Sequence, residues 1–141
     1  MLEKEFLRLL MVDSSSLVRG IGDSNITKKY YDNWSKKYDL TLKKWNYTVP
    51  SKSINLLKKK LKQKPNSILD LACGTGLFGE KLIKTYRNSN IYGSDISKQS
   101  LEIAKEKKIY SNLTNINFET KKNYKKKFEL VCMIGAMTYC R

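Results

Sequence analysis

The chain has 141 residues, of which 40% are hydrophobic and 11% aromatic. This size and composition suit one globular domain and argue against a chain that is disordered throughout. Three cysteines without any histidine disfavour a zinc site, and the longest apolar run is too short to cross a bilayer. An odd number of thiols without a signal-peptide pattern predicts a reduced protein in the cytoplasm.

The formal net charge of +15 raises the question of nucleic-acid binding. Lysine dominates, since four of the 28 basic residues are arginine, the better reader of phosphates and bases. Runs such as Lys58–Lys60 and Lys125–Lys127 are typical of solvated faces. Nucleic-acid binding therefore stays open but is not favoured, and neither a membrane nor a metal is predicted as a partner.

The N-terminal part of the chain is predicted to contain an arm and a helix. We expect residues 1–24 to form the arm and to be partly flexible. Residues 25–47 form an aromatic helix, because Tyr31, Trp34 and Tyr38 recur at helical spacing. Such a stripe is usually core packing.

A glycine-rich turn follows a predicted buried strand at residues 67–71. The spacing Gly74-x-Gly76-x-x-Gly79 lets the backbone approach a ligand without a Cβ in the way, and the next helix adds N–H donors. The same spacing satisfies the dinucleotide fingerprint, and it also occurs in turns that serve only to connect elements. Asp70 weighs against a pyrophosphate, because its carboxylate adds negative charge nearby, whereas a cationic ligand tolerates that charge.

A second strand is predicted at residues 90–95, after which Ser97 opens a helix. The strand ends in Asp95, 19 residues past Gly76. Nucleotide-binding folds place an acid that binds a ribose diol at this position. Alternatively, Asp95 is an N-cap or turn residue, although Ser97 can cap the helix itself.

Two further strands complete the predicted sheet. The third is expected at Thr114–Phe118, with Glu119 just past it. The fourth, Phe128–Tyr139, is expected to be buried beside the first strand, with Gly135 and Ala136 near its carboxyl end. Its apolar sequence carries no charge to discourage pairing between molecules, so an exposed edge predicts self-association and poor stability.

Together these motifs resemble the class I S-adenosylmethionine (SAM) methyltransferases, in particular the Williams-Beuren syndrome region methyltransferase-like proteins. The resemblance covers about residues 25–141 and rests on Tyr-Asp-x-Trp, Ile-Leu-Asp-Leu-Ala-Cys-Gly-Thr-Gly-Leu, Gly-Ser-Asp-Ile-Ser and Ile-Gly-Ala-Met-Thr. It implies a three-layer α/β/α Rossmann-like fold with parallel strands in the order 3-2-1-4. Residues 25–47 would be the lid helix and 48–141 the N-terminal part of the SAM-binding domain. Because the family fold continues after its fourth strand, we expect a fragment that is inactive alone.

The resemblance implies an enzyme that transfers a methyl group from SAM to an acceptor, with a small molecule favoured by the lid helix. Asp70 and the glycine turn would face the methionine part, Asp95 the ribose and Ile96 the adenine. No catalytic residue is identified. The cofactor-binding residues implied by position are Asp70, Ala72, Cys73, Gly74, Thr75, Gly76, Asp95, Ile96, Glu119, Ile134, Gly135 and Ala136, with Tyr31 and Tyr38 from the lid helix. The alternatives are a NAD-dependent oxidoreductase and a basic RNA-binding or scaffold module.

Overall fold

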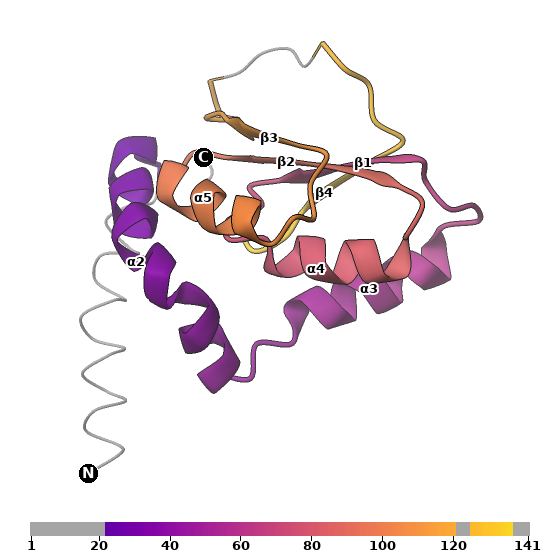
Figure 1. Cartoon of the computed structure of the whole chain (residues 1–141), viewed down its shortest axis with the longest axis horizontal. Coiled ribbons are helices and arrows are strands. Elements are labelled where there is room, and N and C mark those ends of the chain that lie inside the picture. The colour runs from indigo at the N-terminus through magenta and orange to yellow at the C-terminus, as the bar shows by residue number, and fades with distance from the viewer. Residues whose placement is uncertain (1–21, 121–124, 137–141) are drawn as a thin grey trace.

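The computed structural model describes residues 22–120 and 125–136, which form an open α/β sheet with flanking helices (Figure 1). In chain order the elements are α2 (Ser24–Lys44), α3 (Val49–Lys60), β1 (Ser67–Leu71), α4 (Leu77–Thr85), β2 (Asn90–Asp95), α5 (Lys98–Glu106), β3 (Asn112–Asn115) and β4 (Leu130–Met133). Most of the predicted N-terminal arm lies outside the described residues, as do Tyr139 and the third cysteine, Cys140.

The four strands are parallel and lie in the order β3-β2-β1-β4, which confirms the predicted fold class and strand order. In the register, Leu71 at the end of β1 lies opposite Ser94 of β2 and Met133 of β4. The carboxyl ends of the three strands therefore meet at one edge of the sheet. Ligands of open parallel sheets bind at this edge, next to the strand where the order reverses.

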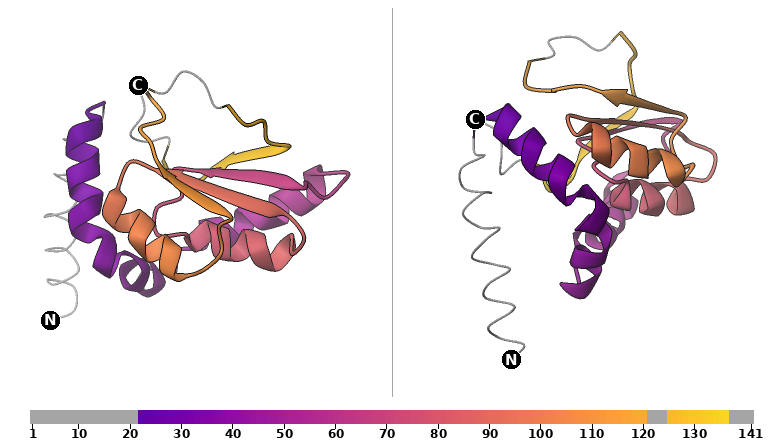
Figure 2. Two further views of the ribbon diagram at one scale, coloured as in Figure 1. Left: turned by 45° about the horizontal axis from the view of Figure 1, so that its top comes forward. Right: turned by 60° about the vertical axis from the view of Figure 1, so that its left-hand side comes forward.

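The core lies between the sheet and the helices on one of its faces. Ile68 of β1, Ile91 of β2 and Leu82 of α4 are each at most 1% exposed, and Ile54 of α3 packs in the same cluster. Figure 2 shows α3, α4 and α5 on this side of the sheet, with α2 beside α5 at the edge of the molecule. Among the described helices, none is both long and apolar enough to span a bilayer.

The third strand occupies Asn112–Asn115, so the prediction of Thr114–Phe118 was wrong in its bounds. Its last residue, Asn115, is the register partner of Asp95, where β2 itself ends. Ile116 donates its N–H to the Asp95 carbonyl and closes the ladder. The apolar residues after it, which suggested a strand, lie past the end of the neighbouring strand.

The fourth strand is also shorter than predicted. It ends at Met133, and Gly135 has a φ of +79°, a conformation that does not continue a strand. The expectation that it is buried throughout was wrong, because Val131 is 54% exposed while Cys132 is buried. The strand therefore alternates between a packed face and an open one in the described part of the chain.

Candidate functional site

The glycine turn between β1 and α4 is built from three residues in the left-handed region. Ala72, Gly74 and Gly76 have φ values of +57°, +54° and +89°. A Cβ added to Gly74 would meet no atom within 4 Å, so this part of the backbone borders open space. Ala72 adopts the conformation without being a glycine, at a cost of about 1–2 kcal/mol. Such backbone strain clusters at ligand-binding sites.

Asp95 joins the end of β2 to this turn. One carboxylate oxygen accepts the N–H of Gly74 at 2.8 Å, and the other accepts the N–H of Ser97 at 2.8 Å. Ser97 caps α5, since its hydroxyl accepts the N–H of Ser100. The carboxylate retains lone-pair sites for further donors. Burial raises the pKa of Asp95 above its usual value, although backbone N–H groups oppose this shift.

Asp70 lies inside β1, where its carboxylate accepts a hydrogen bond of 2.7 Å from the hydroxyl of Tyr110. Burial, together with the nearby charge of Asp95, raises the pKa of Asp70 to about 7 against the opposing effect of that hydrogen bond. Burial also raises the pKa of the Tyr110 hydroxyl, so it stays protonated and donates. The pKa of the Cys73 thiol is raised mainly by burial, which makes Cys73 a poor nucleophile.

Tyr110 fills a socket made of glycines. A Cβ on Gly76 would lie 3.2 Å from its ring, and one on Gly93 would lie 3.0 Å from it. A Cβ on Gly79 would collide with the Tyr110 hydroxyl. The glycines therefore make room for the ring that supports Asp70.

A cleft runs along the carboxyl ends of β1, β2 and β4, under α2. Its volume is about 660 Å³ when the space at its open mouth is included. Predicted site residues that line it are Tyr31, Tyr38, Ala72, Gly74, Asp95, Ile96, Glu119, Ile134, Gly135 and Ala136. An adjoining smaller pocket brings in Asp70, Cys73 and Thr75, while Gly76 lines neither.

The aromatic helix α2 forms one wall of the cleft. Its rings pack on one another: the centroids of Trp34 and Tyr38 are 4.7 Å apart, and those of Tyr31 and Tyr38 are 6.1 Å apart. Both tyrosines line the cleft, and Tyr38 also lines the smaller pocket. The stripe that left two interpretations open from sequence thus provides ring-to-ring packing and a surface toward the cleft.

The sequence model of the family described as "Methyltransferase domain" matches residues 62–134. This segment holds β1, the glycine turn, Asp95 and β4, which together build the cleft floor. The chain belongs to this family. Its class I, SAM-dependent type is the one that the sequence motifs resemble, and the four-stranded sheet agrees with it.

Curated relatives of this chain are also named as methyltransferases. Human methyltransferase-like protein 27 is 30% identical over 84% of this chain and 50% of its own length. Malonyl-[acyl-carrier protein] O-methyltransferase 1 of Ilyobacter polytropus is 41% identical over 49% of this chain and 26% of its own length. This methyltransferase-family chain thus spans half or less of the length of these two relatives.

Solved methyltransferase structures share the fold. The plantazolicin methyltransferase BpumL, in complex with SAH, superposes with a TM-score of 0.53 at 20% identity, covering 94% of this chain and 50% of the other. A TehB-like SAM-dependent methyltransferase from Corynebacterium glutamicum gives a TM-score of 0.58 at 18% identity, over 77% of this chain and 56% of the other.

Several residues that line the cleft were not found from the sequence. Ser24, Thr27, Asn117 and Phe118 line the cleft without belonging to any motif. Tyr110 gave no local signal, since it lies in the loop between α5 and β3. No three His, Cys, Asp or Glu side chains lie close enough to hold a metal within residues 22–120 and 125–136.

Proposed function

We propose that the protein binds SAM in the cleft and transfers its methyl group to a small-molecule acceptor. The observation that carries this proposal is the 2.8 Å hydrogen bond between the Asp95 carboxylate and the Gly74 N–H. It fixes an acid with free lone pairs beside a stretch of backbone that faces open space. A ribose diol is bound by an acid of this kind. The part of the ligand next to the ribose can lie close to the backbone at Gly74, because no Cβ stands in the way.

The residues around this bond fit the rest of the cofactor. Ile96 and Phe118 offer apolar surface for an adenine, and Glu119 lies at the same end of the cleft. Asp70, Cys73 and Thr75 border the pocket that would receive the methionine part. When bound, SAM would supply a methyl group on a positively charged sulfur. A nucleophilic atom of the acceptor would attack the methyl carbon directly, and the electron pair of the broken carbon–sulfur bond would leave with the demethylated product. The protein would accelerate this step by holding the two reactants in line.

The acceptor class is supported by the form of the cleft and by the relatives. Tyr31 and Tyr38 give its outer wall flat apolar surface with hydroxyl groups, which suits a small organic molecule. Relatives are named for malonyl-[acyl-carrier protein], and structural neighbours for plantazolicin and for a sugar. In this proposal residues 25–47 are the lid helix and 48–141 belong to the cofactor domain. The buried free thiols of Cys73 and Cys132 suit the cytoplasm.

Calorimetric titration tests the cofactor. We expect SAM and its demethylated product to bind and to compete with each other, and NAD to give no heat of binding. Binding of NAD alone would overturn the proposal in favour of an oxidoreductase. Binding of RNA with a steep loss of affinity as salt rises, without any SAM binding, would instead support a basic RNA-binding module.

A further inference from the structure

Helix α2 carries the dipeptide Tyr-Asp twice, at Tyr31-Asp32 and at Tyr38-Asp39. The repeat distance of seven residues is close to two helical turns, so the two copies lie on the same side of the helix. The tyrosines line the cleft. The two aspartates instead bond to other elements: Asp32 to the start of α5 and Asp39 to the glycine turn.

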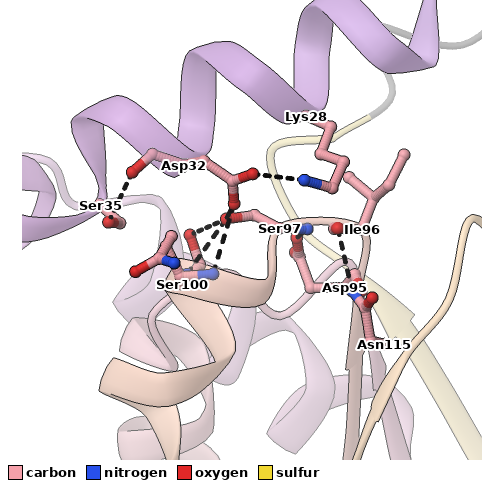
Figure 3. A network of polar contacts seen from close by, with 9 residues as sticks. Lys28, Asp32, Ser35, Asp95, Ile96, Ser97, Ser100 and Asn115 are labelled. Atoms are coloured by element: carbon pink, nitrogen blue, oxygen red, sulfur yellow. Dashed lines mark hydrogen bonds and ion pairs between the residues drawn. The ribbon is translucent and has the colours of Figure 1, made fainter.

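Asp32 bonds to the start of α5, as Figure 3 shows. One oxygen accepts the Ser97 hydroxyl at 2.7 Å and the Gln99 N–H at 3.3 Å, and the other accepts Lys28 Nζ at 2.5 Å. Burial raises the pKa of Asp32, but the hydrogen bonds from Lys28, Ser97 and Gln99 outweigh it and leave the pKa below its ordinary value. Ser97 also bonds to Asp95, so this contact reaches the acid on the cleft floor.

Asp39 bonds to the glycine turn. One oxygen accepts the Thr75 hydroxyl at 2.5 Å, and the other accepts Lys107 Nζ at 2.7 Å. Thr75 is 1% exposed and stands between the two glycines of the turn. A charge-assisted bond to a buried hydroxyl is shorter and stronger than an exposed neutral one. The ion pair with Lys107, which is partly exposed, adds less.

These two contacts matter because they join α2 to the start of α5 and to the glycine turn. Of its 21 residues, Ser35 and Leu42 are the buried ones. Rings of this segment also contact one another, as Trp34 does with Tyr38 and with Trp45. The polar contacts of Asp32 and Asp39 therefore fix the helix relative to the sheet.

We propose that Asp32 and Asp39 are positioning residues that set where Tyr31 and Tyr38 stand over the cleft, and that Asp39 does so through Thr75. The identity of the ligand in the cleft rests on the proposed function, whereas the clamp itself does not. Loss of either aspartate removes a contact that holds this part of α2 against α5 or the glycine turn, so the wall that Tyr31 and Tyr38 give the cleft becomes less firmly placed.

The test compares Asp39→Ala, Thr75→Val and the double variant by hydrogen–deuterium exchange without ligand and by SAM titration. Alanine is the best helix former, so Asp39→Ala leaves the helix propensity intact. Thr41→Val is the matched control, because Thr41 lies on the same helix. Within the described part of the chain, its hydroxyl bonds only to the carbonyl of Lys37. We expect about tenfold faster amide exchange in residues 33–44 for both single variants and unchanged exchange for the control.

We further expect each single variant to weaken SAM binding about tenfold, and the double variant to match the weaker single variant within about twofold. A residue that only stabilises the fold would lower the melting temperature but leave the affinity of the folded protein unchanged. Unchanged exchange in α2, or additive losses of affinity, would overturn the clamp. If the unaltered protein does not bind SAM, the proposed function fails, and the exchange measurement still decides the clamp.

Discussion

The hydroxyl of Tyr110 donates a 2.7 Å hydrogen bond to the carboxylate of Asp70, which is 1% exposed within the central strand β1. Through this bond the loop that follows α5 supports the strand that leads into the glycine turn. Within residues 22–120 and 125–136, no other side chain donates a hydrogen bond to the Asp70 carboxylate, so this carboxylate depends on Tyr110.

Tyr110→Phe should destabilise the protein by about 1–3 kcal/mol, because it leaves a buried carboxyl group without its donor. Urea unfolding at constant pH measures the loss. Tyr86→Phe is the matched control, since the Tyr86 hydroxyl is buried without a hydrogen-bond partner in the described structure. We expect Tyr86→Phe to be neutral or stabilising, and equal losses for the two variants would contradict the role given to the Tyr110 bond.

Asp70 predicts a pH dependence of stability whose sign follows from its raised pKa. Between the ordinary pKa of 3.8 and the folded value of about 7, the folded protein binds a proton that the unfolded chain has released. Stability therefore falls as pH rises through this window and levels off above it. Asp70→Asn removes this contribution. We expect its free energy of unfolding, relative to that of the unaltered protein, to rise from pH 4 to pH 7; a constant difference would show that Asp70 has an ordinary pKa.

The sequence predicted the parts of this fold that depend on neighbouring residues. The apolar run of β1, the glycine turn and the Ser97 cap were found because their signals are local. The predicted end of β3 was wrong because the strand ends where its pairing with β2 ends, at Asp95, which is far away in sequence. Tyr110 and the Asp39–Thr75 bond were missed for the same reason: each partner is ordinary in its own segment, and only the folded chain brings the two together.

Asp95→Ala should weaken SAM binding far more than Lys126→Ala. The first change removes a carboxylate at the cleft, where each charge-assisted hydrogen bond is worth about 1.5–3 kcal/mol. Lys126 is exposed and contacts the Tyr92 side chain outside the cleft. Titration calorimetry of both variants gives the comparison, and equal affinities would show that Asp95 serves only to join the two turns.

Gly74→Ala and Gly79→Ala should fail in different ways. A methyl group at Gly74 meets no protein atom within 4 Å, so stability should fall only by the strain of a positive φ, about 1–2 kcal/mol, while SAM affinity falls sharply. At Gly79 the methyl group collides with the Tyr110 hydroxyl, so stability itself should fall severely. Thermal melts and SAM titrations separate the two effects. Unchanged SAM affinity in Gly74→Ala would place the ligand elsewhere.

Val131→Lys should reduce self-association of the 141-residue chain. β4 pairs with β1 along one edge, no strand within residues 22–120 and 125–136 pairs with its other edge, and Val131 is 54% exposed. A charge on such a strand opposes pairing between molecules. Leu40→Lys is the control, because Leu40 is also apolar and exposed, at 65%, but lies on α2. Sedimentation at several concentrations measures the effect; an equal response to both changes would point to general charge repulsion.

The socket around Tyr110 gives one glycine of the turn pattern a structural role, and this role affects how the pattern can change during evolution. Gly79, the last glycine of the turn pattern, is required by a tyrosine ring rather than by a ligand, and Gly76 and Gly93 border the same ring. Substitutions at Gly79 and Tyr110 are therefore coupled: a lineage that replaces Tyr110 by a small residue frees Gly79 to acquire a side chain. Gly93 would still meet Leu113, and Gly76 would keep its positive φ. Descendants lacking the full glycine pattern would then retain the cleft, and a search that demands the pattern would overlook them.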